Sequence, residues 1–159
     1  MAIDRAATLK NAEKLISQGK VEPAIAEYLR LLEDQPRDWN LANTLGDLYL
    51  RAGQVDTATE LFARMADSLN ESGFLPKASA IYKKVLKLKP DHDHALLQAG
   101  EIAGRLGLLA DARAYLGQLI ARRERSGDKP GVALSEGRSD GPPVHSARVE
   151  LEHTRRPPE

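Results

Sequence analysis

The sequence contains no cysteine and few aromatic residues. Without cysteine, the chain of 159 residues has neither disulfide bonds nor thiolate metal sites. Aromatic residues make up 4% of the chain and do not alternate with basic residues, so few side chains are available to stack on nucleic-acid bases. The composition therefore predicts that nucleic acid is not a partner.

The chain also lacks net charge and long apolar runs. Its 23 acidic and 23 basic residues cancel, which leaves no overall field that would recruit nucleic acid or a membrane surface. No apolar run approaches the roughly 18 residues that a membrane-spanning helix requires. Residues 1–14 lack the apolar segment of a secretory signal. We expect one ordinary domain in the cytoplasm, with no membrane partner.

The chain does contain a repeated pattern: a glycine, an alanine five residues later, and a large apolar residue four residues after the alanine. Glycine can adopt the left-handed conformation that closes the last turn of a helix. The small alanine lets a neighbouring helix approach, and the apolar residue lies one turn further along the same face. The pattern therefore predicts paired helices. Its four copies are Gly19-Ala24-Tyr28, Gly53-Ala58-Phe62, Gly73-Ala78-Tyr82 and Gly107-Ala112-Leu116.

A longer pattern surrounds the second copy, and prolines end two of the periodic segments. The residues that form it are Pro36, Trp39, Leu45, Gly46, Tyr49, Gly53, Ala58, Phe62 and Pro90. In this order they resemble the tetratricopeptide repeat family, and the resemblance covers roughly residues 5 to 125. It implies antiparallel helix pairs that stack into a right-handed solenoid and bind other proteins.

The apolar periodicity predicts an all-α fold with short loops, in which successive helices are antiparallel neighbours, and the resemblance implies that these helices stack into a solenoid. About seven helices are expected, at residues 5–18, 21–34, 38–52, 55–71, 75–88, 91–106 and 108–125. The repeat domain is expected to span residues 1–125, followed by a tail at residues 126–159.

The spacing of the glycines departs from the regular period of the family, which is about 34 residues. Gly53 and Gly73 are closer together than Gly19 and Gly53 are. The helix at residues 55–71 must therefore be the second helix of one pair and the first helix of the next. The resulting unit has three helices and about 54 residues. Pro36 and Pro90 are one such unit apart.

The pattern stops after Pro130. Gly141, Pro142 and Pro143 interrupt any helix there, and the apolar residues lose their helical period. We expect a disordered tail, and an altered reading frame or gene end is the alternative explanation for the abrupt change. Either way, the helix at residues 108–125 lacks the neighbour against which its apolar face would pack.

The sequence shows no arrangement of residues typical of catalysis or of a cofactor site. His92 and His94 are two residues apart, which on a helix points them about 200° apart and prevents a shared metal. Asp91 and Asp93 follow Pro90 and are expected to cap the next helix. Neither a glycine-rich phosphate loop nor a local nucleophile signature is present. We therefore predict no enzymatic activity, metal or cofactor.

The resemblance implies that set positions on the first helix of each pair line a concave groove. One of these positions is acidic in every pair, and a row of four carboxylates would favour a basic segment of the partner. Ordinary solvated surface charge is the alternative interpretation. The lysines at residues 77–89 are expected on the back of the solenoid. The predicted partner-binding residues are Glu13, Asn43, Asp47, Leu50, Asp67, Leu97 and Glu101.

These observations indicate a non-enzymatic scaffold or adaptor that binds a peptide or a partner surface in its groove. The alternative is a structural subunit that self-assembles through the open end at residues 108–125, where Leu116, Leu119 and Ile120 face no following helix.

Overall fold

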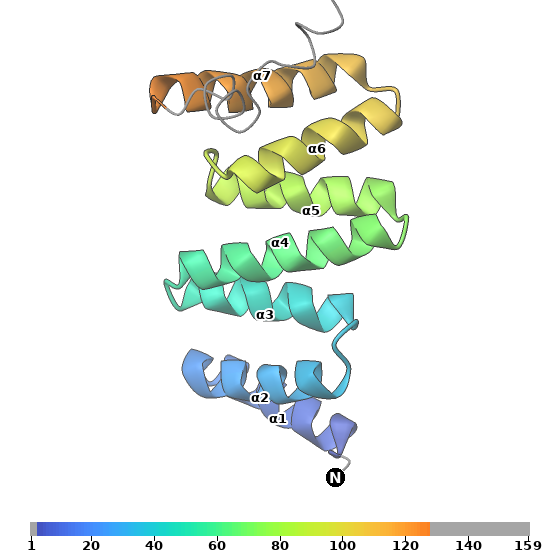
Figure 1. The fold of residues 1–159 in the computed structure, drawn as a ribbon. Helices are drawn as coiled ribbons and strands as arrows, with labels where there is room; N and C mark the ends of the chain where they lie inside the picture. Colours follow the sequence, from blue (N-terminus) through green and yellow to red (C-terminus); the bar gives the residue numbers. More distant parts are fainter. Residues whose placement is uncertain (1–2, 128–159) are drawn as a thin grey trace, which may run out of the picture. The chain divides into compact units, whose positions relative to one another are not determined.

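The computed structural model describes residues 3–127, which contain seven α-helices and no strand (Figure 1). The helices are α1 (Arg5–Ser17), α2 (Val21–Asp34), α3 (Trp39–Arg51), α4 (Val55–Glu71), α5 (Leu75–Leu88), α6 (Asp93–Arg105) and α7 (Leu109–Arg125). Among the described helices, none combines the length and the apolar character that crossing a bilayer requires. The predicted all-α repeat fold is confirmed, and every helix end lies within about two residues of its expected position.

The glycines of the repeated pattern end the helices because they adopt a backbone conformation that other residues avoid. After α3, Gly53 has a φ of 80°. This conformation lets the Gln54 N–H donate to the Tyr49 carbonyl at 2.8 Å and the Gly53 N–H donate to the Leu50 carbonyl at 3.0 Å. The same pair of bonds closes the helices that precede Gly19, Gly73 and Gly107.

The N-terminus of α6 differs from the expectation that aspartates cap it. His92 is the capping residue, and its Nδ1 accepts a hydrogen bond from the Ala95 N–H at 3.1 Å. Asp93 is instead the first residue of the helix, where its charge meets the positive end of the helix dipole. At α3 the capping position is held by Asp38, whose carboxylate accepts from the Leu41 N–H at 3.1 Å. An imidazole thus replaces a carboxylate in the same role.

The helix α4 is packed most extensively, because it lies against both α3 and α5. Phe62, near its centre, is fully buried. On one side its ring covers Gly46 of α3, where an added Cβ would come within 2.3 Å of a ring carbon. On the other side, the Lys84 ammonium of α5 lies 4.2 Å from the ring centroid. Phe62 of α4 therefore contacts both neighbouring helices.

Helices two apart along the chain are also neighbours, so α1–α6 form two layers. Side chains link α1 to α3 and α3 to α5, while others link α2 to α4 and α4 to α6. The linking pairs are Arg5 with Asp38, Asp47 with Lys84, Glu22 with Gln54, and Asn70 with Gln98. We call α1, α3 and α5 the odd layer, and α2, α4 and α6 the even layer.

The helix bounds repeat along the chain from one three-helix unit to the next. The bounds of α2, α3 and α4 recur in α5, α6 and α7, each shifted by the step that separates Pro36 from Pro90. We call two residues separated by this step counterparts. Because the step covers three helices and the layers alternate, equivalent helices fall in opposite layers: α2 is in the even layer and α5 in the odd layer. A residue and its counterpart therefore do not share a layer.

Of the described residues, those up to Tyr115 form one compact unit, and residues 116–127 group separately. In the second group, the structure describes the remaining part of α7, where Leu119 is half-buried and Ile120 is exposed. The tail predicted at residues 126–159 lies outside the described residues from position 128 onward.

Candidate partner-binding surfaces

The predicted partner-binding residues are divided between the two layers. The members on α1 and α3, in the odd layer, are Glu13, Asn43, Asp47 and Leu50, and those on α4 and α6, in the even layer, are Asp67, Leu97 and Glu101. On α5, Lys84 bonds Asp47 and Tyr82 bonds Asp67. Residues two apart on a helix point in nearly opposite directions. The expected single row of four carboxylates is therefore not formed.

Asp47 is already engaged by a lysine of the same chain. The Lys84 ammonium lies 3.1 Å from the Asp47 carboxylate and 2.9 Å from the Asn43 side-chain oxygen. It also sits above the Phe62 ring, so three helices contribute to its surroundings. The negative charge that was expected to attract a basic partner is therefore largely balanced within the odd layer.

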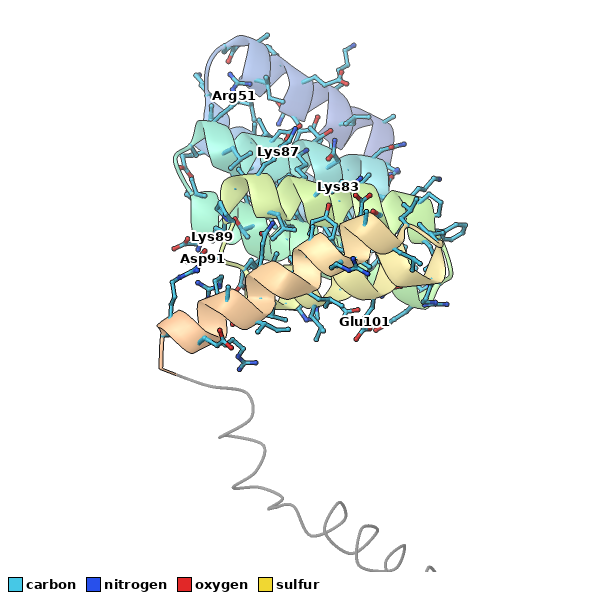
Figure 2. The ribbon with its side chains drawn as sticks, turned by 90° about the horizontal axis from the view of Figure 1, so that it is seen from above. Arg51, Lys83, Lys87, Lys89, Asp91 and Glu101 are labelled. Atoms are coloured by element: carbon cyan, nitrogen blue, oxygen red, sulfur yellow. The ribbon has the colours of Figure 1, made fainter. Side chains whose placement is uncertain are left out.

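Lys84 of α5 lies beside α3 rather than on the back of the molecule, because its ammonium reaches Asn43 and Asp47, whereas Lys89 pairs with Asp56 of α4. Lys83 and Lys87 are exposed and form no ion pair within residues 3–127, and the same holds for Arg51 of α3. Figure 2 shows Lys83 and Lys87 extending from α5 on the side of Arg51, with Glu101 toward the opposite edge of the view. The odd layer thus carries an excess of uncompensated positive charge at α3 and α5.

A hollow of about 320 Å³ lies between α3 and α5, with α4 as its floor. Asn40 and Asn43 of α3 and Lys77 of α5 supply polar groups at its walls. The apolar part is formed by Trp39, Met65, Leu69, Ala80 and Ile81. Concave sites with an apolar lining and a few placed polar groups are typical binding sites. This hollow and the neighbouring cations form one continuous candidate surface, which we call the α3/α5 surface.

Asp67 lies at a junction of three helices and is also engaged within the chain. It accepts a hydrogen bond from the Tyr82 hydroxyl of α5, and its carboxylate is 2.8 Å from Nε2 of His94 of α6. Burial and, second, the hydrogen bond to Asp67 raise the pKa of Tyr82 well above its ordinary value. Within residues 3–127 no group of three metal-ligating side chains occurs. Through Asp67 the junction connects α4 to α5 and α6.

The two remaining even-layer predictions, Leu97 and Glu101, are exposed on α6. Glu101 makes no ion pair with another described residue. In the odd layer, Glu13 is exposed on α1, and Leu50 is half-buried on α3. These residues do not meet in one groove, because they come from different layers.

The sequence did not predict a second concave surface, in the even layer. An apolar groove of about 460 Å³ lies between α2 and α4, with α3 as its floor. Its lining residues are Leu29, Leu32, Glu33, Pro36, Leu45, Tyr49, Thr57, Leu61 and Arg64. One feature of the sequence could have indicated this groove. Leu29 is an exposed leucine at a position whose counterpart, Lys83, is charged.

A family model described as tetratricopeptide repeat matches the chain twice, at residues 9–71 and 64–129. Together the two matches cover more than half of the chain. They overlap at residues 64–71, in the second half of α4, which is the helix that packs against both α3 and α5.

One curated relative is BBSome complex member BBS4 from Bos taurus, which is 25% identical over 122 residues. The match covers 69% of this chain and 24% of that protein, so the chain spans about a quarter of the length of this relative. Among solved structures, MamA from Desulfovibrio magneticus RS-1 is 17% identical, with a TM-score of 0.39, over 79% of this chain and 78% of the MamA chain. YrrB, described as a TPR protein with an unusual peptide-binding site, is 18% identical, with a TM-score of 0.38, over 74% of this chain and 86% of its own.

Proposed function

Because the chain belongs to the tetratricopeptide repeat family, whose members are generally non-catalytic modules that bind other proteins, we propose that it is an adaptor that binds a partner segment on the α3/α5 surface. The observation that carries this proposal is the hollow of about 320 Å³ between α3 and α5. Its apolar lining can receive a side chain, while Asn40 and Asn43 offer hydrogen bonds to a peptide backbone.

The charges around the hollow favour an acidic partner segment rather than the basic one expected from the sequence. Asp47 is paired with Lys84, whereas Arg51, Lys83 and Lys87 have no carboxylate partner within residues 3–127. Each exposed ion pair contributes only about 0.2–1 kcal/mol, so the cations would select the partner and speed association. Contacts in the hollow would supply most of the affinity. Of the residues predicted from the sequence, Asn43 lines the hollow, and Asp47 is the partner of Lys84 beside it.

The proposal can be tested with two labelled peptides that share one central leucine and differ only in their flanks, Asp/Glu in one and Lys/Arg in the other. We expect the acidic peptide to bind more tightly and to alter the emission of Trp39, the single tryptophan of the chain. Reversing charge with Lys83→Glu and Lys87→Glu should weaken this binding, most clearly at low salt.

A matched control changes the net charge by the same amount, but at two lysines of α1. Lys10→Glu and Lys14→Glu reverse the charge of two exposed lysines of α1. If these two substitutions weaken binding of the acidic peptide as much as Lys83→Glu and Lys87→Glu do, then the overall charge, and not the α3/α5 surface, governs binding. Tighter binding of the basic peptide would reverse the proposed partner chemistry.

Self-assembly is the second candidate function, and exposed leucines at the start of α7 favour it. Leu108 is 47% exposed and Leu109 is 68% exposed, and further along the helix Ile120 is 51% exposed. Apolar side chains left open at the end of a repeat stack are sites where copies associate. Sedimentation over a wide concentration range should then show a mass that rises with concentration, and Leu109→Lys should abolish the rise. A constant mass would exclude this function.

A further inference from the structure

The apolar groove between α2 and α4 lies in the even layer, and none of its lining residues lines the α3/α5 hollow. Leu29 and Leu32 of α2 form one wall, Leu61 of α4 the other, and Leu45 and Tyr49 of α3 the floor. Its volume of about 460 Å³ falls in the range of pockets that hold ligands or side chains of a partner. Past Leu32 and Leu61 it continues into a second hollow of about 260 Å³, whose lining includes Trp39 and Met65, two residues that also line the α3/α5 hollow.

The exposure of Leu29 is not required by the helix on which it lies. Leu29 is 39% exposed, and its counterpart on α5 is the exposed Lys83. Similarly, the counterpart of Glu33 is Lys87. The position therefore accepts a fully solvated lysine, and a leucine there leaves apolar surface in contact with water at a cost. Unlike the equally exposed Leu97, Leu29 is continuous with a concave apolar lining, and this larger apolar surface is what a partner would cover.

The two walls of the groove carry opposite charges. Glu33 lies on the α2 wall and Arg64 on the α4 wall, and both are exposed. Neither forms an ion pair within residues 3–127. A segment that fills the groove would therefore meet a negative charge along one edge and a positive charge along the other.

We propose that this groove binds an amphipathic helix of another protein, with basic residues along its α2 edge and acidic residues along its α4 edge. A helix presents apolar side chains at every third or fourth position as one ridge, which suits a groove between two helices. An extended segment would need polar groups that bond its backbone, as Asn40 and Asn43 could do in the α3/α5 hollow, whereas most of the residues that line this groove are apolar. The groove thus accepts one apolar ridge in one orientation.

A synthetic helical peptide tests this proposal directly. The probe carries leucines along one face, lysines along one edge and glutamates along the other, and a control peptide has glutamine in place of each leucine. Binding of the labelled probe is followed by fluorescence anisotropy. We expect the leucine peptide to bind and the glutamine peptide to bind at least about tenfold more weakly, because the apolar ridge supplies the affinity.

Two leucines of nearly equal exposure provide a matched pair of variants. Leu29 lines the groove at 39% exposed, and Leu97 lies outside it on α6 at 38% exposed. We expect Leu29→Lys to lower the affinity for the probe about tenfold or more, and Leu97→Lys to change this affinity less than about twofold. The helical spectrum and melting temperature of both variants verify that the fold is intact.

The charges are tested by reversing both walls. The double variant Glu33→Lys/Arg64→Glu should bind the original probe more weakly and should prefer a probe whose charged edges are exchanged. No preference for leucine over glutamine, or equal effects of Leu29→Lys and Leu97→Lys, would overturn the proposal. Binding of the acidic peptide to the α3/α5 surface should not respond to Leu29→Lys, so the two surfaces can fail separately.

Discussion

The helices α2 and α3 match α5 and α6 residue by residue, one unit apart, and α1 matches the C-terminal part of α4. The two halves nevertheless differ in the side-chain bonds that connect their helices. Tyr28 and Tyr82 are both buried, and they are counterparts, as are the acidic residues Glu13 and Asp67 that precede them. In the second half, Asp67 accepts a hydrogen bond from Tyr82 and meets His94. In the first half, burial and, to a smaller extent, the charge of Glu13 raise the pKa of Tyr28. The tyrosine is thus buried in both halves, but among residues 3–127 a hydrogen bond from it to a carboxylate is found only in the second half.

The outer surfaces of the two halves differ more than their interiors. Leu29 and Glu33 on α2 border an apolar groove, whereas their counterparts Lys83 and Lys87 on α5 carry positive charge. The repeated interior specifies how helices stack, and the side chains that face outward are free to specify different partners. This comparison explains how one short stack can offer two unlike surfaces.

The largest expected effect comes from the phenylalanine at which the two halves meet. Phe62→Ala should lower the free energy of unfolding by about 3–5 kcal/mol, because it removes a fully buried ring between α3 and α5. Phe74, the other phenylalanine, is exposed, and Phe74→Ala should cost less than about 1 kcal/mol. Chemical denaturation of both variants measures these changes in the free energy of unfolding. Similar losses for the two would mean that Phe62 does not join the halves.

A second prediction compares the two tyrosines. Tyr82→Phe should cost about 1.5–3 kcal/mol, because it removes a hydrogen bond to the Asp67 carboxylate in a buried setting. Tyr28→Phe should cost less than about 0.5 kcal/mol, since Glu13 acts on Tyr28 by charge. Thermal and urea unfolding of the two variants would reveal the difference, and equal costs would contradict the proposed asymmetry.

The dependence of the free energy of unfolding on pH gives a second test of the role of Tyr82. The folded state raises the pKa of Tyr82 above its ordinary value of 10.0, so below pH 10 both states keep the proton. Above pH 10 the unfolded state releases it while the folded state retains it, and the free energy of unfolding falls as the pH rises. Unfolding curves between pH 8 and pH 11, about the range in which tyrosine begins to ionise, should fall less steeply for Tyr82→Phe than for the wild type. An unchanged slope would contradict this prediction.

The smallest expected effect concerns the link between α3 and α5. Lys84→Met should cost about 1 kcal/mol, because it removes one partly exposed ion pair and one ammonium–ring contact. The neighbouring Lys83 has no such partners among residues 3–127, and Lys83→Met should stay within about 0.5 kcal/mol of the wild type. The difference between the variants should shrink at high salt. A cost that salt does not change would show that the methylene chain of Lys84, not its charge, matters.

The sequence predicted the helices well because their ends are determined locally. A glycine such as Gly53 closes a helix with bonds to residues only three to five positions away, so its signal is visible in a short stretch. The burial of Phe62 was also predictable, since the spacing from Gly53 repeats in other copies. The cap at His92 was missed, because an imidazole nitrogen rarely takes the role that a carboxylate has at Asp38.

The surfaces were harder to predict because they depend on helices that are not adjacent in the sequence. The four carboxylates were assigned to one groove from their positions within each helix, but the layer of a helix depends on how many helices precede it. Lys84 was placed on the back for the same reason, although it reaches Asp47 on α3. The groove between α2 and α4 required knowing that Leu29 and Leu61 face each other across α3.

The helix bounds recur after three helices, which is an odd number, whereas helices of one layer are separated by an even number. Moving along the chain by one unit carries a side chain to the other face, and a second unit is needed to return it to the first. An engineered insertion of one such unit would therefore turn every downstream surface over, whereas an ordinary two-helix repeat of about 34 residues would preserve it. A duplicated unit would display its binding residues on opposite sides of the stack. The number of inserted helices, as well as their sequence, would therefore decide which partners can be bound together.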